Sequence, residues 1–396
     1  MATESPLIRD HRAPHTSVNP SSQSMPPKRI LFLINTLGTG GWERDVAMIC
    51  RHIDQARYLP EVWTLRPGGE NEPLVREAGI TVRSLERRRA GDPIFGLRVA
   101  RALAQTDFDL WHAFLPAILY YAAFARTLHR QRAPLVYSEG TIGLSNPWRA
   151  PFFRWAIRRQ CTVFTANSQS SRAFLVSQGI PSEKIAIIPN GHEFDRFRAP
   201  LDRQGLRSSL GISPLERLVI TVGRLTATKR FCDLIEAIGR LQPRYPHLRL
   251  AIVGDGEDRT LLEEQVRALK LQAVVQFLGT RRDVPELLRS SDLFAFASEM
   301  EGLPNAVIEA SLASLPIVGS NIGGVREVVE DGRSATLVPV RDPAALALAM
   351  ESYLDDVALA RRHGEAARQR AEQLFAVENT IQRLYEVYEQ VFSPRA

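Results

Sequence analysis

Short apolar runs alternate with longer amphipathic runs along this chain from about residue 29 onward. In the first half, the runs that predict strands cover residues 30–35, 59–65, 80–85, 110–114, 135–139, 161–167 and 185–189. In the second half, they cover residues 218–223, 248–254, 274–279, 293–298, 316–320 and 336–340. Strands that are nearly continuous in Val, Ile and Leu are typical of parallel sheets covered by helices on both faces. The pattern therefore predicts an α/β protein with doubly wound parallel sheets.

The same alternation occurs twice, which predicts two domains. A chain of 396 residues is long enough for two cores of ordinary size. The polar, turn-rich stretch 198–215 places the boundary between domains of residues 29–200 and 201–374. Residues 1–28 are rich in Pro and Ser and lack an apolar segment, so we expect a disordered tail and no signal peptide. The amphipathic end of the chain, residues 375–396, is expected to form a helix that packs back across the domains.

The charge of the chain is unevenly distributed. Residues 1–200 contain 26 Lys and Arg against 17 Asp and Glu, whereas the second half contains 24 against 27. A basic first half favours an anionic partner there, such as a phosphate-bearing substrate or a membrane surface. An Arg-rich composition without a binding role is the alternative. No recognition motif for nucleic acid accompanies the charge, so we expect no nucleic-acid partner.

Cysteine, histidine and hydropathy patterns bound the environment of the protein. Cys50, Cys161 and Cys232 are far apart, which favours a reducing cytoplasm over a disulfide framework. The eight histidines show no metal-ligand spacing, so we expect no structural zinc. The most apolar run, residues 110–125, is shorter than the ~20 residues that a membrane-spanning helix needs. We therefore predict a cytoplasmic protein without a transmembrane segment.

Two motifs at the carboxyl ends of predicted strands suit a phosphate-bearing ligand, because ligands of open parallel sheets bind there. In NTLGTGGWERDVAMI (35–49), the glycines permit close backbone approach, and the following helix offers free N–H groups to an anion. In VGRLTATKRF (222–231), Arg224 and Lys229 provide two cations that suit a diphosphate. The alternatives are a glycine turn needed only for packing and two solvated surface charges.

The third motif is EMEGLPNAVIEAS (299–311), which also follows a predicted strand. Pro304 suits the first turn of a helix, whose N–H groups can hold phosphate oxygens. Glu301 and Glu309, on either side of that helix start, can accept hydrogen bonds from hydroxyl groups. A nucleotide-sugar, with a diphosphate between two hydroxylated rings, satisfies all of these features. The alternative is a pair of surface glutamates on an amphipathic helix.

Together, these motifs resemble the retaining family-4 glycosyltransferases of GT-B fold. The resemblance covers nearly the whole chain after residue 28. It rests on LGTGGWE, VGRLTATK, IVGDGEDRTLLEE, residues 165–197 and residues 301–332, where E-x7-E spacing precedes a Pro-Ile-Val strand and a Gly-Gly turn. It implies two facing Rossmann-like domains with a cleft between them. It also implies retention of the anomeric configuration, with no metal ion and no cofactor in the site.

The resemblance assigns roles to individual residues. Glu301 is implied to contact the donor sugar and Glu309 the nucleotide ribose, while Arg224 and Lys229 hold the diphosphate. A loop around residues 280–283 is expected to help select the base, mostly through backbone groups. The other expected donor-binding positions are Gly40 and Gly41 near the β-phosphate, and Gly254, Arg282, Gly302, Leu303, Pro304 and Asn305.

One departure from the family concerns the end of the predicted strand 135–139. The family often places a histidine there, facing the reacting sugar, and this chain has Glu139. A carboxylate can orient the acceptor hydroxyl or stabilise positive charge at the anomeric carbon, so Glu139 is a candidate catalytic residue. The role of a histidine is not transferred to it.

Acceptors in this family bind mainly the N-terminal domain, which is the basic half here. The stretch NPWRAPFFRWAIRRQ (146–160) mixes aromatic and cationic residues, as interfacial helices do. Our hypothesis is that it contacts an anionic membrane, as a peripheral protein of the inner face, or a lipid-diphosphate acceptor. The alternative is that the aromatic residues of this stretch pack on the sheet. His112, at the end of a predicted strand, either faces the cleft or is a hydrogen-bonded core histidine. The candidate residues are His112, Trp148, Arg149, Phe152, Arg154 and Trp155.

The sequence thus predicts a transferase that moves a hexosyl group from a nucleotide-sugar to a glycan or lipid-linked acceptor in surface polysaccharide or glycolipid synthesis. A UDP-sugar is the favoured donor and GDP-mannose the second. A sugar-nucleotide epimerase is one alternative, because such enzymes share the two-domain architecture. A non-catalytic nucleotide-sugar-binding protein is the other, and the Glu139 departure leaves it open.

Overall fold

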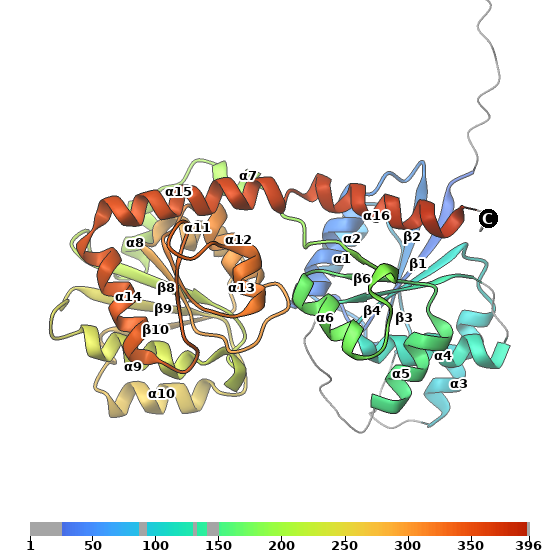
Figure 1. Cartoon of the computed structure of the whole chain (residues 1–396), viewed down its shortest axis with the longest axis horizontal. Coiled ribbons are helices and arrows are strands. Elements are labelled where there is room, and N and C mark those ends of the chain that lie inside the picture. Colours follow the sequence, from blue (N-terminus) through green and yellow to red (C-terminus); the bar gives the residue numbers. More distant parts are fainter. Residues whose placement is uncertain (1–25, 87–92, 130–132, 141–149, 394–396) are drawn as a thin grey trace, which may run out of the picture.

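The computed structural model describes residues 26–86, 93–129, 133–140 and 150–393. Figure 1 shows two α/β domains side by side, with the last two helices running along both of them. Most of the expected N-terminal tail, residues 1–25, lies outside the described residues.

The N-terminal domain is built on a seven-stranded sheet with the order β3-β2-β1-β4-β5-β6-β7 in the described residues, and its strand pairs are parallel. The strand order reverses between β1 and β4. Its strands are β1 (Lys28–Ile34), β2 (Tyr58–Thr64), β3 (Val82–Ser84), β4 (Leu110–Phe114), β5 (Leu135–Glu139), β6 (Val163–Ala166) and β7 (Ile185–Ile187). Its helices are α1 (Gly41–His52), α2 (Glu72–Glu77), α3 (Pro93–Ala104), α4 (Pro116–His129), α5 (Ala150–Gln160), α6 (Gln169–Ser177) and the 3-10 turn η2 (Ser182–Lys184).

The C-terminal domain has a six-stranded parallel sheet with the order β10-β9-β8-β11-β12-β13, which reverses between β8 and β11. Its strands are β8 (Arg217–Val222), β9 (Leu248–Val253), β10 (Val275–Gly279), β11 (Leu293–Phe296), β12 (Ile317–Ser320) and β13 (Thr336–Val338). The helices around it are α7 (Asp195–Arg198), α8 (Arg203–Ser209), η3 (Ala227–Lys229), α9 (Phe231–Leu241), α10 (Arg259–Ala268), α11 (Val284–Ser290), α12 (Asn305–Leu312), α13 (Gly323–Val328), α14 (Pro343–Asp355) and α15 (Val357–Leu374).

Strand β1 shows why the apolar runs form buried strands. Its residues alternate between two cores: Leu31 and Leu33 pack with α3 and α4, whereas Ile30, Phe32 and Ile34 pack with α1 and the last helix, α16 (Val377–Phe392). All five side chains are fully buried. Such a strand needs apolar residues at every position, since both faces are covered. The predicted doubly wound α/β class is confirmed.

The chain crosses between the domains twice, and the two crossings lie side by side. Helix α7 packs against α11, and Phe197 lies in the C-terminal core, so the first crossing comes before Asp195 rather than near residue 200. The second crossing joins α15 to α16. The His192 N–H donates to the Phe375 carbonyl at 2.8 Å, and the Val377 N–H donates to the His192 carbonyl at 3.3 Å. Helix α15 lies on the C-terminal domain, whereas α16 lies on the N-terminal one (Figure 1).

Candidate active site

Three loops that follow central strands form the candidate site. One runs from β1 to α1, the second follows β8, and the third joins β11 to α12. These strands flank the positions at which the strand order reverses in the two sheets. All three loops therefore lie at the carboxyl edges where open parallel sheets bind ligands.

The start of α12 faces the N-terminal domain. The helix begins at Asn305, after Pro304 in extended conformation at the N-cap. Asn305 and Glu309 are four positions apart and so share one face of the helix. On that face, Asn190 Nδ2 of the N-terminal domain donates a hydrogen bond to Asn305 Oδ1 at 2.9 Å. Leu303, just before the helix, is buried.

Glu301 and Lys229 form an ion pair between the loop before α12 and the loop after β8. Their side chains are only 13% and 25% exposed, so the pair is largely shielded from water. Lys229 Nζ also lies 5.6 Å from the centroid of the Phe296 ring, at the end of β11. Arg224, in the same loop as Lys229, is exposed. The structure thus brings two of the four expected donor contacts together and leaves Arg224 at the surface.

Glu309 is paired with Arg44, a residue of α1 in the opposite domain. Arg44 Nη2 also lies 2.9 Å from His192 Nε2. Burial raises the pKa of Glu309, and the charge of Arg44 lowers it in part. Burial, and to a lesser extent the charge of Arg44, hold the pKa of His192 well below its usual range, so the ring is neutral. Arg44, His192 and Asn190 thus line the candidate site, and the sequence motifs do not predict them.

Asp45, next to Arg44 on α1, has a buried carboxyl group with few polar partners. It is 5% exposed, and among the described residues neither of its carboxylate oxygens has a hydrogen-bond partner. Its Oδ1 lies 3.6 Å from Arg44 Nη2, which is beyond hydrogen-bond distance. Burial raises the pKa of Asp45 to about 7, although Arg44 opposes the shift. Arg44 therefore stands between two acids.

Two expected glycines lie where the domains touch. A Cβ on Gly41, at the start of α1, would come within 3.0 Å of Asn305 Nδ2. A Cβ on Gly302 would come within 2.3 Å of the carbonyl oxygen of Gly140, which follows β5. Real Cβ atoms do not approach a backbone oxygen so closely, so a side chain at Gly302 would push the two loops apart.

Other expected donor-binding positions lie around these loops. Gly254 has a φ of +131°, and a Cβ there would lie 1.9 Å from the Gly223 carbonyl oxygen, so the loops after β8 and β9 can meet only with glycine. Gly40 is the N-cap of α1. Arg282, after β10, is exposed, and its carbonyl accepts a hydrogen bond from Arg196 Nη2 at 2.9 Å.

Glu139 ends β5 with its carboxylate fully buried. The Tyr137 hydroxyl donates to Oε2 at 2.7 Å, and the Gly140 N–H donates to Oε1 at 3.0 Å. Tyr137 and Glu139 are two positions apart and therefore lie on the same face of the strand. That face carries the core formed with α3, α4 and α5. In this arrangement, the carboxylate is bonded within its own domain.

His112 lies in the core, as in the core-histidine alternative. It is 1% exposed, its Nδ1 lies 2.8 Å from the Tyr388 hydroxyl of α16, and its Nε2 lies 2.7 Å from Ser138 Oγ. Burial lowers its pKa to about 3, so the ring is neutral. The network ties the last helix to β4 and β5, and it keeps His112 away from any acceptor at the surface.

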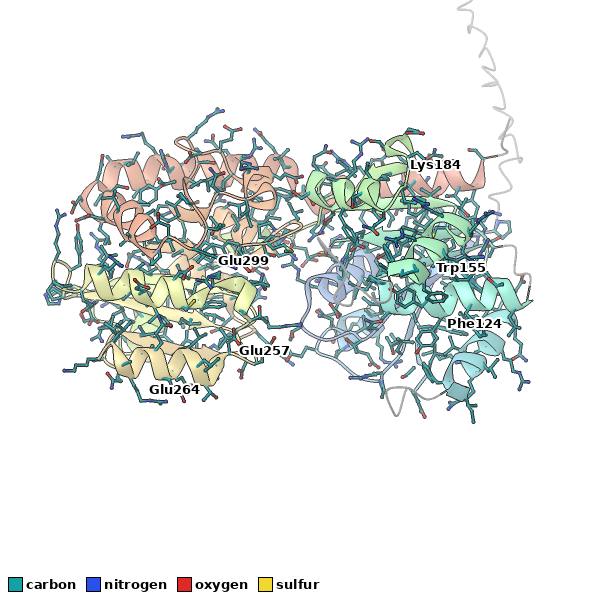
Figure 2. All side chains as sticks on the ribbon, turned by 60° about the horizontal axis from the view of Figure 1, so that its bottom comes forward. Phe124, Trp155, Lys184, Glu257, Glu264 and Glu299 are labelled. Atoms are coloured by element: carbon teal, nitrogen blue, oxygen red, sulfur yellow. The ribbon has the colours of Figure 1, made fainter. Side chains whose placement is uncertain are left out.

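The aromatic and cationic stretch forms α5 on the outer side of the N-terminal domain. Phe152 is 42% exposed and stacks on Trp155, with ring centroids 5.1 Å apart, and Arg154 is exposed. Figure 2 labels Phe124 of α4 and Trp155 of α5 in the N-terminal domain, where these two helices pack against each other. The expected positions Trp148 and Arg149 lie outside the described residues.

Metal sites and membrane spans each need a recognisable arrangement of residues. In the part of the chain that the structure describes, no three His, Cys, Asp or Glu residues are grouped as metal ligands. Among the same residues, no helix combines the length and the apolar character needed to cross a bilayer.

Comparison with known proteins connects this geometry to a family. A sequence profile described as "Glycosyl transferases group 1" matches residues 202–370, and one described as "Glycosyltransferase Family 4" matches residues 39–196. The chain is 30% identical over 307 residues to N-acetyl-alpha-D-glucosaminyl L-malate synthase of Bacillus anthracis, covering 75% of this chain and 79% of that protein. It is 33% identical over 218 residues to glycogen synthase of Mycobacterium tuberculosis, covering 54% of this chain and about half, 51%, of the synthase.

Solved structures share the arrangement of both domains. HepE of Anabaena, in complex with UDP-glucose, is similar with a TM-score of 0.81 and 26% identity, over 91% of this chain and 99% of that one. WaaG, a glycosyltransferase involved in lipopolysaccharide biosynthesis, has a TM-score of 0.74 and 18% identity, over 92% and 100%, and shows the fold alone. Since both halves match the family profiles and the whole chain matches the two-domain structures, this chain belongs to the family-4 glycosyltransferases of GT-B fold.

Proposed function

We propose that this protein transfers a hexosyl group from a nucleotide-sugar to a glycan or lipid-linked acceptor, with retention at the anomeric carbon and without a metal ion in the site. A UDP-sugar is the first candidate donor and GDP-mannose the second. The solved complexes of HepE with UDP and UDP-glucose support UDP as the first choice. The LpsB mannosyltransferase of lipopolysaccharide core biosynthesis in Rhizobium meliloti, 26% identical over 295 residues, supports a place in surface polysaccharide or glycolipid synthesis.

One observation carries this proposal: polar groups of both domains converge on the start of α12. Lys229 reaches Glu301 within the C-terminal domain, and Arg44 reaches Glu309 from the N-terminal domain. The two acids are eight positions apart, with the first turn of the helix between them. A diphosphate at that turn, with the sugar toward Glu301 and the ribose toward Glu309, would use each group.

The chemistry we propose is stabilisation of the leaving diphosphate. Lys229, Arg224 and the first N–H groups of α12 would hold the charge that develops on the leaving group. Removal of one such donor costs about 3–4 kcal/mol in other enzymes. Contact between the domains would exclude water from the donor sugar and so limit its hydrolysis. Glu139 would take part only after its carboxylate turned away from Tyr137. We therefore keep Glu139 as a candidate residue on the acceptor side of the site.

The test is thermal unfolding with UDP, GDP, ADP and CMP in EDTA, on the native protein and on Glu309→Ala. A nucleotide at a hundred times its dissociation constant adds about 2.7 kcal/mol of stability. We expect UDP to raise the unfolding temperature of the native protein, and to raise that of the variant less. If no nucleotide stabilises the folded native protein, the transferase proposal fails.

Product analysis then separates the alternatives. With UDP-hexose and an acceptor extract, a transferase yields acceptor-linked sugar with the donor's anomeric configuration. An epimerase converts the donor without an acceptor, and a binding protein leaves it unchanged.

We also propose that the outer face of α5 contacts an anionic membrane surface. Phe124 and Phe152 are exposed aromatic residues, 37% and 42%, and Arg154 on α5 is also exposed. Exposed aromatic and cationic side chains on one helix are typical of helices that bind at the membrane interface. Phe152→Ser combined with Arg154→Gln should abolish flotation with vesicles containing anionic lipid, whereas Arg240→Gln on α9 should not. Flotation that is absent in the native protein, or insensitive to salt, would contradict this proposal.

A further inference from the structure

Arg44 belongs to the N-terminal domain, yet its guanidinium is held by groups on three sides at the nucleotide end of the candidate site. Nη1 donates to Glu309 Oε1, and Nη2 lies 2.9 Å from His192 Nε2 and 3.6 Å from Asp45 Oδ1. A guanidinium can only donate, so His192 Nε2 must accept. His192 is neutral, as described above, and Glu309 is therefore the hydrogen-bonded anion that balances Arg44.

Glu309 needs such a partner to stay ionised. Its side chain is 17% exposed, and burial raises its pKa. The charged and titratable groups that face it are Arg44 and Asp45 on α1, the neutral His192 of the crossing segment, and Arg196 on α7. Arg196 is engaged by both carboxylate oxygens of Glu286, at 2.9 and 3.2 Å. Arg44 is therefore the main cation that acts on Glu309.

We propose that Arg44 is a positioning residue of the nucleotide site, which holds Glu309 ionised and leaves its second oxygen for the ribose hydroxyls. This inference rests on the proposed function, because the ribose contact of Glu309 is part of that proposal. Arg44 occupies Oε1, and within the described residues no hydrogen bond to Oε2 is present. A carboxylate accepts hydrogen bonds from a diol better than a protonated acid does, since it offers acceptors only. Recognition of the ribose thus depends on a residue from the facing domain.

The test is calorimetric titration with UDP and with 2′,3′-dideoxy-UDP, from pH 5.5 to 8.5. At pH 7, Arg44→Gln should weaken UDP binding about ten- to a hundredfold, the usual worth of a hydrogen bond to a charged group. Without the guanidinium, the pKa of Glu309 rises further, so the loss should shrink as the pH is raised. Arg44→Lys should recover part of the affinity. The dideoxy analogue, which lacks the hydroxyls, should bind the native protein and Arg44→Gln equally.

Arg51→Gln is the matched control, because Arg51 also lies on α1 and also pairs with the crossing segment, through Glu193 at 2.9 Å. It should bind UDP like the native protein. An equal loss of both ligands in Arg44→Gln, or no loss, would overturn the inference. Failure of the native protein to bind UDP or GDP at all would instead overturn the proposed function, and this inference with it.

Discussion

Glu301 and Lys229 neutralise each other across the loops that precede α12 and follow β8. In our proposal, each has a different partner when the donor is bound: the sugar hydroxyls for Glu301 and the diphosphate for Lys229. Because the donor would replace one ion pair by two separate contacts, the two residues should have separate effects. A variant of Lys229 should change nucleotide affinity, whereas a variant of Glu301 should change turnover.

Lys229→Ala should weaken binding of the nucleotide diphosphate. A charge-assisted hydrogen bond is worth about 1.5–3 kcal/mol, so the UDP dissociation constant should rise about ten- to a hundredfold. Titration calorimetry with UDP and with uridine measures the change. Uridine lacks the diphosphate, so its affinity should not fall. A parallel loss for uridine would show that Lys229 acts on the fold of the loop.

Glu301→Gln should lower turnover and spare nucleotide affinity. The amide keeps the shape but removes the charge, and the loss should be about a hundredfold in kcat if the charge stabilises the transition state. UDP should bind as well as before, or better, because Lys229 is freed from a competing anion. Glu299→Gln is the control, since Glu299 lies two positions away and pairs with Arg341 at 2.8 Å. Equal turnover losses in both variants would contradict the role of Glu301.

Gly302→Ala tests whether contact between the domains matters for turnover. The added Cβ would lie 2.3 Å from the Gly140 carbonyl oxygen, so the loops must separate. The facing groups should then move apart by about 1 Å, and we expect kcat/KM to fall at least tenfold as a result. The unfolding temperature should change little. Gly96→Ala on α3, where the nearest atom is the Tyr121 ring at 3.9 Å, should leave activity unchanged. Normal activity in Gly302→Ala would show that the contact is dispensable.

The strands and one half of the site were predictable, because local patterns determine them. Residues 110–114 and 135–139 were predicted and are β4 and β5, since a strand covered on both faces is apolar along its length. Lys229 and Glu301 follow strands of the same sheet, so one topological rule placed them at one edge. The hydrogen bond between Tyr137 and Glu139 could also have been predicted from the sequence, because alternate residues of a strand share a face.

The cross-domain half was not predictable from local patterns. Arg44 and Glu309 are 265 positions apart, and His112 and Tyr388 are 276 positions apart. Such contacts depend on how the two sheets and the last helix pack together. The only local signal for Arg44 was a cation one turn inside the helix that follows the glycine loop.

Tyr388→Phe tests how strongly the last helix is tied to the N-terminal domain. Loss of the hydroxyl leaves the buried His112 Nδ1 without its partner at 2.8 Å, which should destabilise the domain by about 1–3 kcal/mol. Urea unfolding measures the change, followed by tryptophan fluorescence for this domain, where Trp63 and Trp111 are buried, and by circular dichroism for both domains. Tyr245→Phe, whose hydroxyl bonds the exposed Asp355, should cost less than about 0.5 kcal/mol. Equal effects would mean that the His112 contact adds nothing.

Asp45→Asn should stabilise the protein in a pH-dependent way. The pKa of Asp45 is about 7 in the folded protein against 3.8 for the free side chain, so between these values the folded state keeps a proton that the unfolded chain releases. Stability from this group therefore falls as the pH rises from about 4 to 7 and is constant above that range. The difference between these two pKa values corresponds to a loss of about 4 kcal/mol in the free energy of unfolding, as an upper bound.

The variant removes this loss, because an amide has no proton to release. The free energy of unfolding of Asp45→Asn minus that of the native protein should therefore be more positive at pH 8 than at pH 5, by up to about 3 kcal/mol, because part of the loss has already occurred below pH 5. Urea titrations at the two pH values measure it, and Asp54→Asn, an exposed carboxylate just after the same helix, gives the background. A difference that is the same at both pH values would show that Asp45 is already ionised at pH 5. In that case Arg44 would have to balance Asp45 as well as Glu309, and its hold on Glu309 would be weaker than the geometry indicates.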